Sequence, residues 1–293
     1  MRILRIGNKD FNLDERTIVM GILNVTPDSF SDGGLYYSID KAVEHAKRME
    51  KEGADIIDIG GESSRPGAEP ISVEEELRRV KPVVEQLINE ISIPLSIDTY
   101  KSKVAEEILK LGVNMVNDIT ALRGDKRMVE VVKEYDATVC LMHMKGTPRD
   151  MQINPYYDDV MSEITSFLEE RSRFAMNQGI PRENIIVDPG IGFGKRTGKG
   201  VEDNCTILRK LPRLKKLGFP ILVGASRKTF IGNVCSGKDE PLPVNDRLEG
   251  SLAAACIAVM NGADIVRVHD VLETRRAINL VDSVIKKSKN TKT

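Results

Sequence analysis

The sequence has no cysteine pattern that would cross-link a fold or hold a metal. Its four cysteines, Cys140, Cys205, Cys235 and Cys256, are far apart and include no C-x-x-C pair. A disulfide framework or a structural zinc site is therefore not expected, and a reducing, cytoplasmic compartment is favoured.

An excess of charge of one sign is also missing. The chain has 43 Lys and Arg against 44 Asp and Glu, which gives a formal net charge of −1 at pH 7. A protein that attracts nucleic acid or an acidic membrane through its overall field carries a clear positive excess. We therefore expect no nucleic acid and no membrane among its partners.

Long apolar runs are absent as well. No stretch approaches the roughly 18 apolar residues of a transmembrane helix. The first residues, MRILRIGNKDFNLDERT, lack the apolar centre of a secretory signal. A composition of 41% hydrophobic and 30% charged residues over 293 positions is that of a soluble globular protein with a substantial core.

One glycine-rich segment, DPGIGFGKRTGKG at 188–200, has the composition of a phosphate-binding loop but not its spacing. A P-loop has four residues between its two glycines, and its second glycine precedes Lys and then Ser or Thr. Here three residues separate Gly190 from Gly194, and Lys195 is followed by Arg196. The dinucleotide fingerprint G-x-G-x-x-G fails too, because the glycines are evenly spaced. Nucleotide binding is not indicated.

Short runs rich in Ile and Val alternate along the chain with longer amphipathic segments. The runs that predict strands lie at 17–25, 55–61, 94–99, 114–120, 138–144, 184–190, 220–226 and 264–270. Eight strands that alternate with helices over about 250 residues predict a (β/α)8 TIM barrel, an α/β fold with a parallel sheet. No linker marks a boundary, so we expect a single domain spanning residues 1–293. The segment RILRIGNKDFNL predicts a β-hairpin that closes the barrel bottom.

Polar side chains or glycines stand at the carboxyl end of every predicted strand. In chain order they are Asn24, Gly60 to Glu62, Asp98, Asn117 with Asp118, His143, Asp188, Ser226 to Lys228, and Arg267 with His269. In a barrel these ends converge on one rim, where barrel enzymes keep their active sites. A single Asp at a strand end is most often a helix cap, but eight polar ends are hard to assign to caps. The set suits a flat polar heterocycle with an anionic group.

The loops after the first two strands, 24–34 and 60–70, are rich in Gly, Pro and Ser and carry Asp28, Asp32 and Arg65. Solvated connections have this composition, and so do mobile loops that exclude water from a barrel mouth. Both interpretations are open on composition alone.

Seven ordered blocks at the strand ends resemble the dihydropteroate synthase family. They are NVTPDSFSDGG, DIGGESSRPGA, SIDT, VNDI, VDPGIGFGK, LVGASRK and RVHDV, and the resemblance extends from about residue 18 to 283. It implies a transferase of folate biosynthesis that joins 6-hydroxymethyl-7,8-dihydropterin diphosphate to p-aminobenzoate, releases diphosphate, uses Mg²⁺ and is a target of sulfonamides. It also implies a homodimer, with the small-residue face 251–259 as the candidate interface. An Ala-rich helix that simply packs on the barrel is the alternative.

The resemblance assigns roles to the residues that match the family motifs. For the pterin they are Asp98, Asn117, Met142, Asp188, Lys228 and Arg267; for the diphosphate Ser64, Arg65, Arg267, Val268 and His269; for p-aminobenzoate Phe30, Phe193, Ser226 and Pro66; and for Mg²⁺ Asn24. The residues expected to act in catalysis are Asp98, Asp188, Lys228, Arg65 and Asp32. A carboxylate matches the paired N–H groups of an aminopyrimidine edge. One amide oxygen with substrate phosphates suffices for Mg²⁺, which keeps several waters.

Some features allow two interpretations. The resemblance explains the glycines of DPGIGFGK by close approach to the heterocycle, with a purely structural turn as the alternative. Met142 is equally well explained as a core residue. The basic stretch from Lys195 to Gly200 fits solvated surface or a substrate contact, and the arylamine is either p-aminobenzoate or a modified form of it.

Two other protein classes compete with the synthase. A methyltetrahydrofolate–corrinoid methyltransferase would share the pterin-binding acids and amide but has no use for the blocks SSRPG, SRK and RVH. A non-catalytic pterin-binding protein would tolerate loss of Asp32, Arg65 and His269, and none of them is lost.

Overall fold

The computed structural model describes residues 1–26, 34–65, 67–198, 202–237 and 240–286. Its strands are β1 (Ile3–Ile6), β2 (Lys9–Asn12), β3 (Ile18–Asn24), β4 (Ile56–Gly60), β5 (Leu95–Asp98), β6 (Met115–Asp118), β7 (Thr138–Met142), β8 (Ile185–Asp188), β9 (Leu222–Val223) and β10 (Ile265–Val268). Its α-helices are α1 (Gly34–Lys51), α2 (Val73–Glu90), α3 (Ser102–Leu109), α4 (Met128–Glu134), α5 (Val160–Asn177), α6 (Asp203–Lys210), α7 (Thr229–Cys235), α8 (Leu248–Met260) and α9 (Val271–Ile285). Short 3-10 helices are η2 (Arg182–Asn184), η3 (Leu211–Leu217) and η4 (Val244–Asp246).

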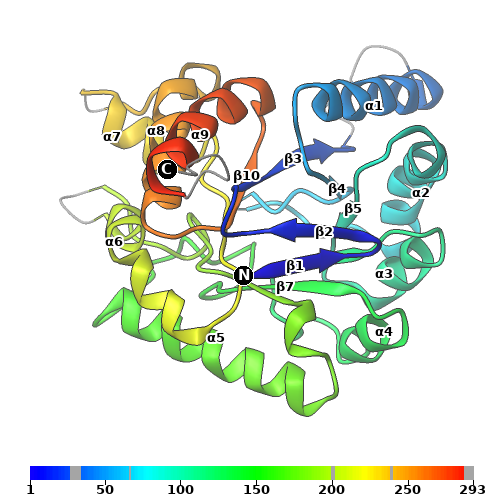
Figure 1. Cartoon of the computed structure of the whole chain (residues 1–293), viewed down its shortest axis with the longest axis horizontal. Helices are drawn as coiled ribbons and strands as arrows, with labels where there is room; N and C mark the ends of the chain where they lie inside the picture. Colours follow the sequence, from blue (N-terminus) through cyan, green and yellow to red (C-terminus); the bar gives the residue numbers. More distant parts are fainter. Residues whose placement is uncertain (27–33, 66, 199–201, 238–239, 287–293) are drawn as a thin grey trace, which may run out of the picture.

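The parallel strands close into a barrel. Within the described residues, eight strands form one sheet in the order β8-β7-β6-β5-β4-β3-β10-β9. Its two edges meet, because Val187 of β8 forms a parallel bridge with Ile221, and the Val187 N–H donates to Pro220 O at 3.0 Å. The helices lie around the outside of the sheet (Figure 1). The predicted (β/α)8 barrel is confirmed.

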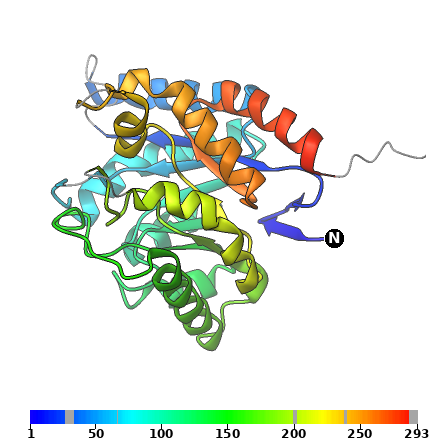
Figure 2. The same ribbon diagram turned by 90° about the vertical axis from the view of Figure 1, so that its left-hand side faces the viewer.

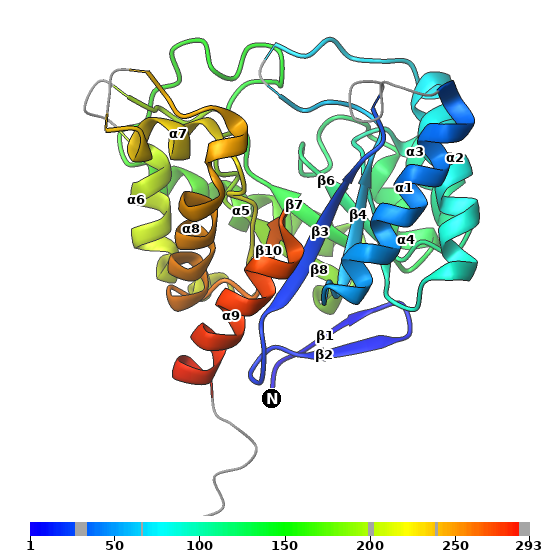
Figure 3. The same cartoon turned by 90° about the horizontal axis from the view of Figure 1, so that it is seen from above.

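The N-terminal hairpin covers the amino end of the barrel. β1 and β2 pair antiparallel around a turn in which Gly7 has φ 58°. Leu4 and Ile6 of β1 are fully buried in the cluster that fills the barrel interior. Figures 2 and 3 show the hairpin at one end of the barrel and the loops that follow the strands at the other. The hairpin therefore closes the barrel bottom, as predicted.

Strand side chains alternate between two apolar layers. In β3, Met20 points into the barrel, whereas Val19 and Leu23 pack outward in the large cluster that the helices cover. The inner layer consists of Ile18, Met20, Ile56, Met115, Cys140, Ile186, Leu222 and Ile265, with the hairpin residues. Most of these residues lie near the amino ends of their strands, so the carboxyl ends are left to polar side chains.

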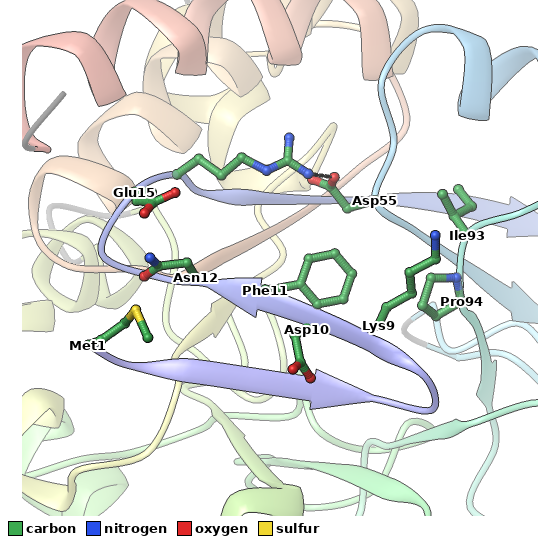
Figure 4. Close-up of a pocket in the computed structure, with 10 residues that line it drawn as sticks. Met1, Lys9, Asp10, Phe11, Asn12, Glu15, Asp55, Ile93 and Pro94 are labelled. Carbon is green, nitrogen blue, oxygen red and sulfur yellow. Dashed lines mark hydrogen bonds and ion pairs between the residues drawn. The ribbon is translucent and has the colours of Figure 1, made fainter. Parts of the chain in front are cut away.

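A buried aspartate at the start of β4 ties the amino end of the barrel together. Asp55 accepts the Val19 N–H at 2.9 Å and pairs with the guanidinium groups of Arg16 and Arg275. Figure 4 shows Asp55 in a pocket beside Phe11 of the hairpin, with its arginine contact as a dashed line. Both carboxylate oxygens of Asp55 are used within the fold.

Local sequence determines where helices begin. Ser72 Oγ accepts the Glu75 N–H at 3.2 Å and caps α2, and glutamates at 74–76 lie at the positive end of its dipole. Asp159 accepts the Met161 N–H at 2.9 Å and caps α5. None of the helices described has the length and apolarity needed to cross a membrane.

Candidate active site

The strand register brings predicted site residues to one rim of the barrel. Asn24 of β3 pairs with Gly60 of β4, Gly60 with Asp98 of β5, and Asp98 with Asn117 of β6. Asp188 ends β8, two strands beyond Asn117. Adjacent parallel strands hold such residues at similar heights, so these polar groups converge at the carboxyl end.

Arg267 of β10 connects these residues across the barrel mouth. Its Nη2 donates to Asp98 Oδ2 at 2.7 Å, and its Nε donates to Asp58 Oδ2 at 2.6 Å. Asn117 Nδ2 donates to the same Asp58 oxygen at 2.9 Å. Burial opposes the charge of Arg267, but Asp58 and Asp98 outweigh it and raise the pKa of Arg267. One charged network therefore joins β4, β5, β6 and β10.

Asp58 is a site residue that the sequence analysis did not identify. Its side chain is 0% exposed, and its Oδ1 has no hydrogen-bond partner among the described residues. A buried polar atom without a partner costs about 1–3 kcal/mol, and in a native protein a water or a ligand usually completes it. Asp58 was missed because it lies inside the apolar run IIDIG of β4. Asp58 stands two positions before Gly60, so the two residues face the same side of the strand. This alternation was the one signal in the sequence that could have identified Asp58.

Burial changes the acidity of the two predicted pterin-binding acids. Desolvation raises the pKa of Asp98 to about 7, although Arg267 opposes this effect. Desolvation also raises the pKa of Asp188, opposed by the Gly190 N–H, which donates to Asp188 Oδ1 at 2.7 Å. Carboxyl groups with perturbed pKa values in a barrel mouth are characteristic of functional sites.

Lys228 points into the same mouth from the turn after β9. Its ammonium donates to Ile191 O and lies 4.2 Å from the centre of the Phe193 ring. Burial lowers the pKa of Lys228 to about 7, with Asp188 acting in the opposite direction. The preceding residue, Arg227, has φ 57°, a left-handed conformation that is uncommon for a residue with a side chain. Strained backbone of this kind occurs preferentially at functional sites.

Ser226 and His269 are hydrogen-bonded to each other. Ser226 Oγ accepts the His269 N–H at 3.2 Å and lies 3.0 Å from His269 Nδ1. Burial lowers the pKa of His269 to about 4, and Arg267 contributes to the same shift. The ring is therefore neutral at physiological pH. Ser226, expected to receive p-aminobenzoate, thus shares its hydroxyl with a residue expected to contact the diphosphate.

The other residues predicted for the diphosphate differ in exposure. In the segment after β4, Ser64 is half-buried and Arg65 is exposed. The charge of Arg65 also contributes to the low pKa of His269, so the two lie within electrostatic reach. Val268 is buried at the end of β10, so its backbone rather than its side chain faces the rim. Phe30, Asp32 and Pro66 lie outside the described residues.

The glycine-rich turn after β8 does not form a phosphate nest. The Gly190 and Gly192 N–H groups donate to Asp188 Oδ1 and to Asn204 Oδ1, each at 2.7 Å. The Phe193 N–H donates to Gly190 O at 3.1 Å. A phosphate nest needs converging N–H groups that are available to the anion. These three are already used, which agrees with the sequence argument against nucleotide binding.

The glycines of this turn are required by the neighbouring backbone. Gly190 and Gly194 have φ 69° and 62°, and a Cβ on them would collide with the carbonyl oxygens of His143 and Lys145 in the segment after β7. The neighbouring backbone alone therefore requires glycine at these two positions, and close approach to a heterocycle stays a prediction. The structural-turn alternative accounts for them.

Met142 belongs to a small apolar cluster at the rim. The cluster consists of Ile119, Met142, Met144 and Met151, with Tyr100 and Phe193 packed against it. Met142 is thus a packed residue, as one interpretation expected, but it packs beside Phe193 at the barrel mouth and not in the main core.

Asn24 is the residue predicted to hold Mg²⁺. It is half-buried at the end of β3, and its Oδ1 and Asp98 Oδ2 each lie 3.8 Å from the position that a Cβ on Gly60 would occupy. In the part of the chain that is described, no three His, Cys, Asp or Glu side chains are arranged to hold a metal ion. The donors present fit a hard cation that takes most of its ligands from substrate phosphates and water.

Comparisons with known proteins decide the family. The family model of pterin-binding enzymes matches residues 20–269. The dihydropteroate synthase of Clostridium beijerinckii is 47% identical over 285 residues, covering 97% of this chain and all of the relative. The chain belongs to the dihydropteroate synthase family of pterin-binding enzymes.

Solved structures of dihydropteroate synthases match the whole barrel. The enzyme from Clostridium difficile, crystallised in the presence of pteroic acid, has 49% identity and a TM-score of 0.87, covering 94% of this chain and 100% of that one. The enzyme from Yersinia pestis, in a sulfonamide drug complex, has 43% identity and a TM-score of 0.88, covering 97% and 99%. The predicted family and transferase activity are confirmed: the chain condenses the pterin diphosphate with p-aminobenzoate to form dihydropteroate.

Proposed function

We propose that the network of Asp58, Asp98, Asn117 and Arg267, together with Asp188, holds the pterin ring for this condensation. The observation that carries the proposal is the convergence of Asp98 and Asn117 with a buried acceptor, Asp58 Oδ1, that has no donor among the described residues. The aminopyrimidine edge of a pterin offers several N–H groups, and carboxylates and an amide are their complement.

The diphosphate is proposed to lie against Arg267, His269, Ser64 and Arg65, on the side of the mouth where β10 meets β3. Arg267 keeps its charge, and His269 is neutral and offers a ring N–H. Mg²⁺ would be held by Asn24 and the diphosphate oxygens, where it supplies charge that stabilises the departing diphosphate. The residues present therefore suit an anionic leaving group, whose negative charge increases as the C–O bond breaks.

The reaction breaks the C–O bond at the pterin methylene, and the electron pair leaves with the diphosphate. The arylamine nitrogen then forms a C–N bond to that carbon and loses one proton. An arylamine is uncharged at neutral pH, so its attack requires no strongly basic side chain. The low pKa of His269 is consistent with a binding role and not with a general-base role.

The arylamine is proposed to stack near Phe193, with its carboxylate directed toward Lys228 and Ser226. The Lys228 ammonium already lies 4.2 Å from the Phe193 ring centre, an arrangement that orders both groups. Sulfonamides resemble p-aminobenzoate, so we expect them to compete with it at this position. Phe30 and Pro66 are proposed to complete the pocket, and Asp32 to contribute from the loop after β3.

A homodimer is proposed to form through α8 and α9, two helices that pack together. The small residues of 251–259 turn mainly inward, since Ala254, Ala255 and Ala258 are buried against the barrel. The opposite face carries large exposed apolar side chains on both helices: Ile257, Met260, Leu280, Val284 and Ile285. Large exposed apolar side chains on two helices that pack together are a feature of protein interfaces. Sedimentation of the wild type and of Leu280→Glu tests it: a dimer that becomes monomeric supports the proposal, and a monomeric wild type contradicts it.

A cytoplasmic location is proposed from the cysteines. Cys140, Cys205, Cys235 and Cys256 are all free thiols in the described structure. Two of them, Cys205 and Cys235, are exposed, which suits a reducing compartment.

An assay with purified protein, 6-hydroxymethyl-7,8-dihydropterin diphosphate, p-aminobenzoate and Mg²⁺ tests the reaction. We expect diphosphate to be released only when the arylamine is present, and chelation of Mg²⁺ to lower the rate. Asp188→Asn should remain folded and lose turnover. Full activity of Asp188→Asn, or unchanged activity after chelation, would contradict the assigned roles.

A further inference from the structure

Lys195 is buried in an unusual way. Its side chain is 0% exposed, and its Nζ lies 2.8 Å from Gly190 O, 2.8 Å from Phe193 O and 3.0 Å from His143 Nδ1. Lysines are rarely fully buried unless an acid pairs with them. Among the described residues the hydrogen-bond partners of this lysine are two backbone carbonyls and a ring nitrogen.

The site around Lys195 Nζ is saturated in either protonation state. The two carbonyl oxygens can only accept, so the lysine donates to both. The third position faces His143 Nδ1, which accepts from an ammonium or donates to a neutral amine. Burial lowers the pKa of Lys195 and also lowers the pKa of His143, to about 2. The ring is therefore neutral and suited to this contact.

The partners of Lys195 define the shape of one short loop, residues 190–194. Gly190 begins the loop and Phe193 is its fourth residue, and both direct their carbonyls to the same nitrogen. Gly194 O accepts from Tyr157 Oη at 2.5 Å, so a second buried side chain also holds the loop. The side chain of Lys195 thus holds the backbone of the loop in one conformation. The glycines of the loop would otherwise leave its backbone flexible.

The opposite side of the 190–194 loop faces the active site. Ile191 O accepts from Lys228 Nζ, and the Phe193 ring lies beneath the same ammonium. The Gly190 N–H supports the Asp188 carboxylate. A change in the curvature of the loop therefore moves Phe193 and a contact of Lys228, whereas Asp98 and Asn117 stand on other strands.

We infer that Lys195, with His143 as its third partner, is a positioning residue that holds the 190–194 loop so that Phe193 and Lys228 receive p-aminobenzoate. The inference rests on the proposed role of Phe193 and Lys228, and it adds a residue that touches no substrate. It also gives the first lysine of the basic stretch 195–200 an internal role, because this side chain points into the fold.

Lys195→Met tests the inference, because Met has similar length and no donor. We expect the KM for p-aminobenzoate to rise at least about tenfold. The Kd of the pterin diphosphate should rise by a smaller factor, because Asp188 is tied to the loop only through the Gly190 N–H and Asp98 and Asn117 stand on other strands. A role limited to folding would lower the melting temperature and the active fraction but leave both constants unchanged. Lys216→Met, at an exposed lysine of η3, is the matched control and should change neither constant.

Two substitutions at His143 distinguish the effect of its hydrogen bond from the effect of its packing. The His143 ring packs against Phe167 at 4.9 Å between ring centres. His143→Phe retains an aromatic ring and removes the nitrogen, whereas His143→Asn retains an acceptor near the Nδ1 position and loses the ring. We expect the KM for p-aminobenzoate to rise in His143→Phe and to stay closer to wild type in His143→Asn. The reverse order would overturn the inference, because it would mean that packing alone matters.

Amide hydrogen exchange provides a readout that needs no substrate. Loss of the Lys195 hydrogen bonds should speed exchange of the Phe193 N–H, which donates to Gly190 O, while the amides of β5 and β6 stay protected. Faster exchange in Lys195→Met without catalysis by the wild type would refute the proposed function but not the loop role. Unchanged exchange and an unchanged KM for p-aminobenzoate would refute the positioning role.

Discussion

The two ends of the barrel both carry buried aspartates paired with arginine, and they use them differently. At the amino end, Asp55 takes the Val19 N–H and two guanidinium groups, so both of its oxygens are occupied. At the carboxyl end, Asp58 leaves Oδ1 without a partner in the described structure, and Asp98 shares Arg267 with it.

This difference separates a structural ion pair from a binding site. Burial of a carboxylate is tolerated when its hydrogen bonds are complete. Asp55 at the amino end meets that condition. Asp264 meets it as well, because it accepts the Ile221 N–H at 3.0 Å and pairs with Arg2 at 2.9 Å. At the carboxyl end Asp58 does not meet it, because its Oδ1 has no partner in the described structure, and desolvation raises the pKa of the neighbouring Asp98 to about 7. A ligand rich in N–H groups requires acceptors that lie close together and still have room for a hydrogen bond.

The largest effect is expected from matched substitutions of one acid at each end. Asp98→Asn should lower kcat/KM by roughly a thousandfold or more, because the pterin loses its charged acceptor, with little change in the melting temperature. Asp55→Asn should lower the free energy of unfolding by about 3 kcal/mol, because it leaves buried Arg275 without its countercharge, and should spare kcat/KM of the folded protein. Steady-state kinetics and thermal unfolding of both variants check the contrast. Equal losses of activity would remove the distinction between the two ends.

Substitution of one arginine at each end should also separate activity from stability, with a smaller difference in activity. Arg267→Met removes the cation that faces Asp58, Asp98 and the proposed diphosphate, so kcat should fall about a hundredfold. Arg275→Met removes a partner of Asp55 and of the carbonyls of Gly53 and Thr17. It should reduce stability and leave kcat within about twofold. An Arg267→Met enzyme with wild-type kcat would exclude leaving-group stabilisation by this residue.

The pH dependence of pterin binding should separate the ends further. The pKa of Asp98 is raised, so the free protein binds a proton there below about pH 7. The pterin N–H groups need the carboxylate, so binding releases that proton, and affinity should weaken by up to about tenfold for each pH unit below 7. Calorimetry in two buffers with different ionisation heats measures the released proton. In Asp98→Asn the release should disappear, whereas Asp55→Asn should retain it.

The smallest expected effect concerns Asp58. Its negative charge helps to raise the pKa of Asp98, so Asp58→Asn should shift the midpoint of pterin binding to lower pH. The amide oxygen can still accept from Arg267, but the amide N–H then replaces the acceptor at Oδ1, so affinity at pH 8 should fall by about tenfold. A midpoint that stays at wild-type pH would mean that the two acids are not coupled.

Much of this arrangement could be predicted from the sequence because barrel strands end in recognisable places. Asp98, Asn117 and Asp188 each close an apolar run, and the parallel register brings such ends to one rim. The hairpin was predictable from its turn at Gly7 and from the apolar residues Leu4 and Ile6, which fill the barrel bottom.

What the sequence could not provide was the pairing inside the barrel. Asp58 lies within an apolar run, and its partner Arg267 is 209 residues away, so no local pattern connects them. Lys195 belongs to a stretch whose composition resembles solvated surface, and only the backbone path of residues 190–194 shows that it turns inward. The glycines were assigned to ligand approach because the carbonyls of His143 and Lys145 are distant in sequence.

The most direct test of this account is a crystal structure of the protein with pteroic acid bound. We expect one pterin ring to make hydrogen bonds with Asp98, Asn117 and Asp188, with a ring N–H or an ordered water completing Asp58 Oδ1. A pterin bound elsewhere, with Asp98, Asn117 and Asp188 keeping the partners they have without ligand, would contradict the claim that the buried acids at the carboxyl end form the active site.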